Sequence, residues 1–209
     1  MWFFNLANSK LLLSETGTFA GTSGNAVFDK YHSRRYFLEK RWEQGENIFT
    51  AIMMNPSNAA HNKSDKTVDQ LINVAKAHDC HTLYVVNISS IISGSSSKLN
   101  SAHFAFEEIN WNFISAAISE AKYIFIGWGI KGHKGILKQQ KSNPDLVSTF
   151  KNALSKTYCY EVLKSEDKKY ENKSLFFVPH PRPLKAQNKY SEVAIRKIKE
   201  HEFENLFFR

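Results

Sequence analysis

Short apolar runs alternate with segments of helical periodicity along this chain, and that alternation restricts the fold more than any other feature. Between the runs, apolar residues recur three and four positions apart, as at Val68, Leu71, Ile72 and Ala75, which predicts amphipathic helices. Strands joined by helical crossovers build a mostly parallel sheet with helices on both faces. We therefore expect an α/β fold with three layers, α/β/α, around a mostly parallel, four-stranded central sheet. The expected strands are 48–54, 83–88, 123–128 and 158–163, with a last strand at 175–178.

The chain of 209 residues predicts a single domain, because no long stretch rich in Gly, Pro or Ser divides it. We expect residues 1–47 to form an N-terminal extension packed on the core, 48–190 to form the core, and 191–209 to form a basic C-terminal helix. Residues 164–174 are predicted to form a charged, hairpin-like turn.

The charge of the chain is strongly positive, with 28 Lys and Arg against 20 Asp and Glu and a net charge of +8. The resulting pI of about 9.4 favours a polyanionic partner, of which nucleic acid is the natural candidate. The alternative is an ordinary basic protein that binds no nucleic acid.

The two cysteines, Cys80 and Cys159, are too few for a disulfide framework or an all-cysteine iron–sulfur cluster. The run His-Asp-Cys-His at 78–81 is too compact to surround one tetrahedral metal ion and predicts the end of a helix instead. We expect no metal and no cofactor. The apolar N-terminus lacks the features of a signal peptide, and no window approaches 18 apolar residues, so we expect a cytoplasmic protein without a membrane span.

Polar motifs follow the predicted strands at the points where they end. Asn55-Pro56-Ser57, Asn87 and Trp128-Gly129 come after three central strands, and Pro179-His180-Pro181-Arg182-Pro183-Leu184 follows the last one. The prolines stiffen this final loop and keep it from becoming helical. Since ligands of open α/β sheets bind beyond the carboxyl ends of the strands, we expect these motifs to converge on one edge.

The same motifs resemble an uncharacterised bacterial and phage domain family whose pattern runs Asn-Pro-Ser, Asp-x-Thr, Val-Val-Asn, here at 55–57, 65–67 and 85–87. Residues 31–42 also fit that family. Over residues 48–190 the order of motifs is similar to the uracil-DNA glycosylase superfamily, with 180–184 matching its His-Pro-Ser-Pro-Leu loop except for one substitution. Two departures are present: the first motif lacks the carboxylate of the most active members, and the uncharacterised family usually carries a different Pro-His-Pro arrangement near its end.

The resemblance implies a monofunctional DNA glycosylase, which flips out a base and hydrolyses its N-glycosidic bond. His180 would donate a hydrogen bond to the departing base, Asn87 would read the base, and Asn55 would hold the water. Asn55 cannot take a proton from that water, so Asp65 is our candidate for the missing carboxylate. Its position just before a periodic helix equally predicts a helix cap, and both readings stay open.

The substrate prediction rests on residue 57. Where the best-known uracil enzymes carry a tyrosine that blocks the pyrimidine 5-position, this chain has Ser57, followed by Asn58. We hypothesise a 5-substituted pyrimidine, such as hydroxymethylated or glucosylated cytosine in phage DNA, and a role in anti-phage defence. In the alternative, a neighbouring side chain such as Tyr84 or Phe104 refills the gap and the substrate is uracil or a mismatch product.

DNA would be held by basic and apolar side chains on loops of the same edge, including a predicted glycine-rich turn at 127–135. Leu184 resembles the wedge that fills the stack after flipping. We expect a monomer. Two other functions are open: a non-catalytic DNA-binding module of the same fold, and a hydrolase of free nucleosides or nucleotides. The predicted DNA contacts are Lys131, His133, Lys134, Arg182, Leu184 and Lys185.

Overall fold

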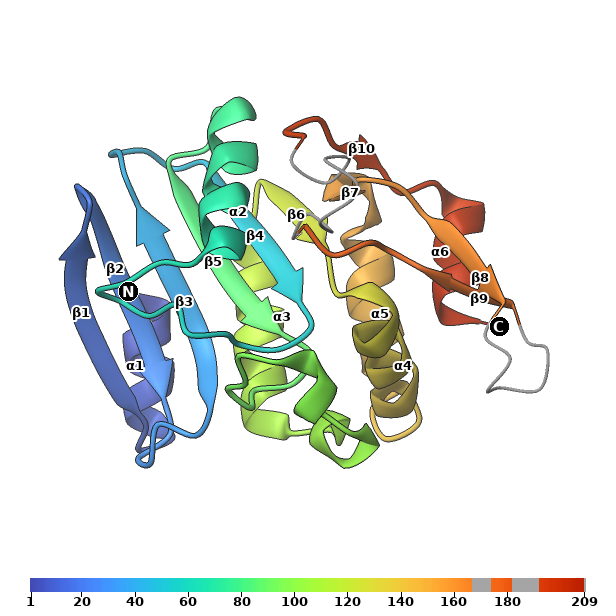
Figure 1. The fold of residues 1–209 in the computed structure, drawn as a ribbon, viewed down its shortest axis with the longest axis horizontal. Coiled ribbons are helices and arrows are strands. Elements are labelled where there is room, and N and C mark those ends of the chain that lie inside the picture. Colours follow the sequence, from blue (N-terminus) through green and yellow to red (C-terminus); the bar gives the residue numbers. More distant parts are fainter. Residues whose placement is uncertain (167–173, 182–191, 209) are drawn as a thin grey trace.

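A computed structural model describes residues 1–166, 174–181 and 192–208 of the chain. Its main feature is an eight-stranded mixed sheet with the order β1-β2-β3-β5-β4-β6-β7-β10 (Figure 1). The strands of this sheet are β1 (Leu13–Phe19), β2 (Thr22–Phe28), β3 (Arg35–Arg41), β4 (Ile48–Met53), β5 (Thr82–Asn87), β6 (Tyr123–Ile126), β7 (Thr157–Cys159) and β10 (Arg196–Lys197).

Helices cover both faces of the sheet. In Figure 1, α2 lies in front of the sheet, and α1 and α3 lie behind it. Two buried apolar clusters agree with this arrangement, since one contains side chains of α2 and the other contains side chains of the remaining α-helices. The helices are α1 (Trp2–Ser9), α2 (Lys66–Ala77), α3 (Glu108–Glu120), α4 (Gly129–Gln140), α5 (Asp145–Asn152) and α6 (Glu200–Phe207), with short 3₁₀ turns η1 (Ser96–Lys98), η2 (Ser101–Phe104) and η3 (Leu154–Lys156).

The predicted α/β class is confirmed, and β5, β4, β6 and β7 form the expected parallel centre. The prediction of a four-stranded sheet was wrong, because antiparallel strands extend this centre on both sides. Residues 1–47 are not merely an extension packed on the core, since β1, β2 and β3 continue the same sheet. Ala20 and Gly21, both at positive φ, form the tight two-residue turn that joins β1 to β2.

The C-terminal part of the chain also differs from the prediction. Strand β9 (Ser174–Phe177) pairs with β8 (Leu163–Glu166) in a separate two-stranded sheet instead of joining the main one. Residues 196–197, predicted as part of a basic helix, form β10 at the edge of the main sheet. The helix begins only at Glu200, and Arg196 binds Glu202 in its first turn through two hydrogen bonds of 2.8 and 2.7 Å.

The segment 57–65, which begins at the last residue of the first motif, is bound by side chains of the antiparallel strand β3. The buried Lys40 ammonium donates to the His61 carbonyl at 2.9 Å, and the buried Arg35 guanidinium donates to the Ala59 carbonyl. Gly24 allows this close approach, because a Cβ atom at that position would collide with the His61 carbonyl. The N-terminal strands therefore position a loop that belongs to the site.

In the three described stretches of the chain, no helix has the length and apolar character needed to cross a membrane.

Candidate functional site

Four of the predicted motifs meet at the carboxyl ends of the parallel strands. Backbone hydrogen bonds join them: Ile88 N to Met53 O at 2.9 Å, Gly127 N to Ile52 O at 3.1 Å, and Gly129 N to Val178 O at 2.9 Å. The last of these brings the loop with His180 to the end of β6, although β9 lies outside the main sheet. The predicted convergence is confirmed for the described residues, which include the last motif as far as Pro181.

The polar group that stands out at this edge is the Asn87 side chain. It ends β5 opposite Met53 of β4 and is only 1 % exposed. Both its amide nitrogen and its amide oxygen lack a hydrogen-bond partner within the described parts of the chain. Leaving a buried amide unpaired costs roughly 1 to 3 kcal/mol, so this residue lowers stability and presents an unused donor and acceptor.

The Asn55 amide group makes hydrogen bonds that hold the first motif in place. Its Nδ2 donates to the Pro56 carbonyl at 2.8 Å and to the Ser93 carbonyl at 3.0 Å, which ties the first motif to the turn after β5. Both amide protons are therefore engaged. Only the Oδ1 atom of Asn55 stays available to orient a water molecule.

Asp65 is the N-cap of α2, so the helix-cap prediction is confirmed. Its Oδ1 accepts from Thr67 N at 2.9 Å and from Val68 N at 3.0 Å, while its Oδ2 accepts from the Ser57 hydroxyl. Burial raises the pKa of this carboxyl, but the Ser57 hydroxyl, the two backbone N–H groups and the Arg35 charge together hold the pKa below the ordinary 3.8. Asp65 is therefore an ionised carboxylate that touches a residue of the first motif.

The proposed substrate residues lie beside these groups. Ser57 is half-buried and Asn58 is exposed, and the Asn58 amide approaches Gly94 in the turn after β5. His180 is half-buried, and its Cβ lies 3.8 Å from where a Cβ on Gly129 would stand. Gly129 has φ +64, a backbone conformation that favours glycine. The connection from β6 to α4 therefore favours glycine at this position.

Helix α4 contradicts one part of the sequence prediction. The glycine-rich stretch predicted as a turn is helical from Gly129, and its glycines allow contact: a Cβ on Gly132 would overlap Trp128, and one on Gly135 would overlap Phe104. His133 is 1 % exposed, and burial together with Lys134 lowers its pKa to about 4. The prediction that His133 contacts phosphate was wrong, because a buried neutral imidazole cannot reach DNA.

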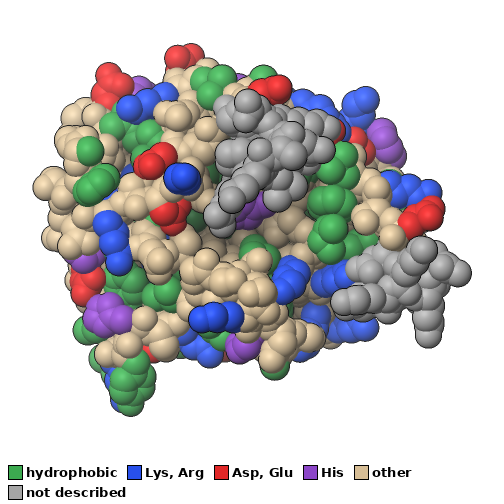
Figure 2. All heavy atoms as spheres, viewed as in Figure 1, with side chains coloured by type: hydrophobic (Ala, Val, Ile, Leu, Met, Phe, Trp, Pro, Cys, Tyr) green, Lys and Arg blue, Asp and Glu red, His purple; other side chains and the backbone are tan. Residues whose placement is uncertain are grey.

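Lys131 and Lys134 of α4, unlike His133, lie where they can contact a polyanion. Figure 2 shows Lys and Arg side chains gathered on the lower right of this face, over the region of α4 and α5 in Figure 1, with few acidic side chains among them. Lys131 is exposed and donates to the Ser96 carbonyl at 2.6 Å and the Leu99 carbonyl at 3.3 Å, and Lys134 is half-buried. The other predicted DNA contacts, Arg182, Leu184 and Lys185, lie outside the described residues.

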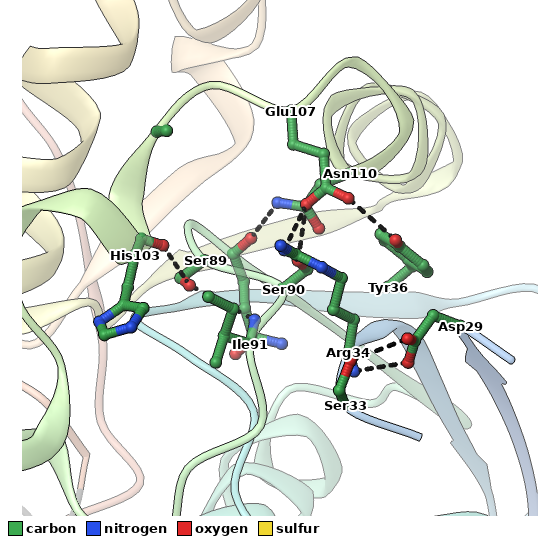
Figure 3. Close-up of polar contacts among 12 residues, drawn as sticks. Asp29, Ser33, Arg34, Tyr36, Ser89, Ser90, Ile91, His103, Glu107 and Asn110 are labelled. Atoms are coloured by element: carbon green, nitrogen blue, oxygen red, sulfur yellow. Dashed lines mark hydrogen bonds and ion pairs between the residues drawn. The ribbon is translucent and has the colours of Figure 1, made fainter. Parts of the chain in front are cut away.

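The sequence prediction missed the buried Arg35 and a polar cavity beside the turn after β5. The cavity is lined by Arg34, Ser90 and Glu107, among others, and Figure 3 shows these three side chains directed toward one another. The sequence signal for this region was the pair Arg34-Arg35 at the start of β3 and the pair Ser89-Ser90, which follows the apolar strand β5. Across the described ranges, no group of three or more His, Cys, Asp or Glu side chains is arranged to hold a metal ion.

The lowered pKa of Asp65 gives a prediction for stability. A carboxyl whose pKa is lower in the folded than in the unfolded protein stabilises the fold above its unfolded pKa, and this contribution is lost as the pH falls through the folded pKa. We expect the free energy of unfolding of the wild type to decrease as the pH falls from about 5 to below 3.8. In Asp65→Asn, which keeps a capping oxygen but cannot ionise, the decrease should be smaller.

Urea denaturation of both proteins at a series of pH values measures this difference. Asp65→Ala serves as the control for the cap, since it should lose about 1 kcal/mol at neutral pH. Identical pH dependence in the wild type and Asp65→Asn would show that the folded protein does not favour the ionised form.

Comparison with known proteins identifies the family of the chain. A family model described as "Protein of unknown function (DUF1643)" matches residues 35–170, from the start of β3 to beyond β8. No curated protein and no solved structure gives a significant match. The matched region includes Asn55, Asp65 and Asn87 and ends before His180. Because the match extends over more than half of its length, the chain belongs to the DUF1643 family.

Proposed function

We propose that this protein is a DNA glycosylase that flips out a base and hydrolyses its N-glycosidic bond, leaving an abasic site. The observation that carries the proposal is the Asn87 amide, which is buried at the ligand-binding edge of the sheet and has no hydrogen-bond partner among the described residues. An unpaired buried amide costs stability, and a base edge with one donor and one acceptor would satisfy it.

The chemistry needs a donor at the base and a negative charge near the sugar. When the N-glycosidic bond breaks, negative charge develops on the departing base and positive charge on the sugar. In the proposal, the His180 imidazole donates to the base oxygen as that charge develops. The ionised Asp65 carboxylate would stabilise the sugar cation or act as general base toward a water on Asn55 Oδ1.

Basic side chains near this edge would hold the DNA. The net charge of +8 and the lysines at positions 131, 134, 138 and 141 on and after α4 support a phosphate backbone as partner. Lys131 donates to two carbonyl groups, which leaves one of its three N–H donors for a phosphate.

A second candidate, a DNA-binding module without catalysis, is favoured by one observation. The Asn55 Nδ2 protons bind two carbonyl groups, and Asp65 accepts hydrogen bonds from Ser57 and from its own helix, so the groups proposed for the water step also have structural tasks. Incubation with DNA duplexes that carry different bases, followed by alkali, separates the two functions. Strand cleavage indicates a glycosylase, and salt-dependent binding without cleavage indicates the module.

Replacement of His180 by alanine tests the transition-state role. We expect His180→Ala to lose about 10²-fold or more in the rate of base release while DNA binding changes little, because the charge on the base is present mainly in the transition state. Single-turnover kinetics and binding titrations measure the two effects. His201→Ala, an exposed histidine on α6, is the matched control and should behave like the wild type. Equal losses of binding and rate would refute the assignment.

Replacement of Asn87 by leucine separates function from stability. Because Leu is apolar and similar in size, Asn87→Leu should remove base release and leave the free energy of unfolding unchanged or raise it by about 1 kcal/mol. The matched control is Asn110→Leu on α3. The Asn110 amide donates to the Asn87 carbonyl at 2.8 Å, so this variant should be destabilised. If Asn87→Leu unfolds as easily as Asn110→Leu, the Asn87 amide has a structural role.

The substrate of the proposed enzyme is a 5-substituted pyrimidine, such as a hydroxymethylated or glucosylated cytosine of phage DNA. We expect Ser57→Tyr to block release of a bulky 5-modified cytosine and to spare release of uracil, because a phenol ring would fill the space beside the 5-position. Ser57→Ala is the control, since it removes the hydroxyl group that binds Asp65 but adds no bulk. Release of uracil alone by the wild type would contradict the open pocket, as would equal release of the bulky base by Ser57→Tyr.

A further inference from the structure

The cavity beside the turn after β5 lies on the α3 side of the sheet and is separate from the Asn87 amide. Its volume is about 210 Å³, and it opens between residues 88–91 and residues 102–107. Its walls are partly apolar, formed by Ile88, Ile91 and Phe106, and partly polar, formed by Arg34, Ser90 and Glu107. A planar ligand with polar atoms along its edge matches such a lining.

The polar wall is built around the Glu107 carboxylate (Figure 3). Its Oε1 accepts from the Tyr36 hydroxyl at 2.9 Å, and its Oε2 accepts from the buried Ser90 hydroxyl at 2.6 Å and from Arg34 Nη1 at 3.1 Å. Arg34 Nη1 also donates to the Ser90 hydroxyl oxygen at 2.7 Å. These bonds hold the guanidinium in one orientation. They also balance its charge, so a multiply charged anion gains little here.

Hydrogen-bond donors are left over in this cavity. Within the described residues, Arg34 Nε and Nη2 make no hydrogen bond, and the Arg34 side chain is 38 % exposed. His103 Nδ1 accepts from Asn100 N at 2.9 Å, so the ring nitrogen that donates is Nε2, which is a second donor of the lining. The cavity thus offers fixed donors to a ligand with adjacent acceptors and little net charge.

We propose that this cavity binds a guanine base. Guanine presents O6 and N7 side by side, and an arginine fork reads this pair of acceptors bidentately. Adenine offers a donor in place of O6 and would oppose the Arg34 fork. Ile88, Ile91 and Phe106 would contact the base apart from its polar edge. The site rests on the contacts of the cavity itself and does not require base excision. The guanine can come from a free nucleoside or from a nucleic acid strand.

Isothermal titration of the full chain tests the proposal with two sets of probes. The first set is guanosine, inosine and adenosine, in which inosine keeps O6 and N7. The second set is an oligothymidine strand with and without one central deoxyguanosine. We expect binding of guanosine and inosine at least about tenfold tighter than of adenosine, or the same preference for the strand that contains guanine. The set of probes that shows the preference identifies the source of the base, a free nucleoside or a nucleic acid strand.

Three variants locate the site. Arg34→Lys keeps the charge but removes the fork and should weaken guanine binding about tenfold. Ala105→Phe fills the cavity from an exposed position and should abolish binding without touching the polar bonds. Arg41→Lys, at the other end of β3, is the matched control and should bind as the wild type does.

Denaturation curves of each variant separate loss of binding from loss of the fold. No guanine preference in either set of probes, or unchanged binding by Ala105→Phe, would overturn the proposal. His180→Ala should bind guanine normally. The guanine site and base release can therefore fail independently of each other.

Discussion

The parallel pairing of β4 with both β5 and β6 is the interaction on which the rest of the structure depends. β4 is buried along its whole length, and its two neighbours run in the same direction. Parallel strands require long crossovers, so α2 and the segment that contains α3 must return over the faces of the sheet. Every loop that leaves the carboxyl ends then starts at the same edge. The proximity of the first motif, Asn87 and Gly129 follows directly from this pairing.

The buried polar side chains near that edge include some that are hydrogen-bonded and one that is not hydrogen-bonded within the described residues. Arg35 and Lys40 are fully buried on β3, and burial lowers the pKa of Arg35 to about 10 and that of Lys40 to about 8. Both donate to carbonyl groups of segment 57–65, so their burial holds a loop in place. The Asn87 amide has no such partner in the part of the chain that the structure describes. A protein keeps such a costly residue most readily where a ligand completes its hydrogen bonds, which is why the proposed function rests on it.

The two proposed sites share a strand end but lie on different faces of the sheet. Asp65, which binds Ser57, caps α2, whereas Glu107 precedes α3 on the other face. The turn after β5 connects them, because Asn55 binds the Ser93 carbonyl and Arg34 binds the Ser90 hydroxyl. Residues 88–93 therefore link the two proposed sites through side-chain hydrogen bonds.

Local sequence patterns were sufficient to predict the helices and strands that are determined by residues close to one another in the sequence. The periodicity of Val68, Leu71 and Ala75 predicted α2. A helix cap was one of the two roles predicted for Asp65, because a cap acts within its own first turn. The runs at 48–54, 83–88 and 123–128 predicted β4, β5 and β6, since fully buried strands are apolar throughout. The rule for strand ends then predicted that Asn55, Asn87, Trp128 and His180 would converge.

Features that depend on contacts between residues distant in the sequence could be determined only from the tertiary structure. Arg196 and Lys197 form a strand because β7 offers them an edge, and the helical state of 129–135 depends on Trp128 and Phe104 filling the space that its glycines leave. β3 carries three buried charged residues, a composition typical of exposed strands, and segment 57–65 is what covers Arg35 and Lys40. The environment of the Asn87 amide and the cavity beside Arg34 and Glu107 also depend on residues that are distant in the sequence. Sequence determines which groups a residue carries, whereas burial and hydrogen bonding depend on neighbours that only the folded chain brings into contact.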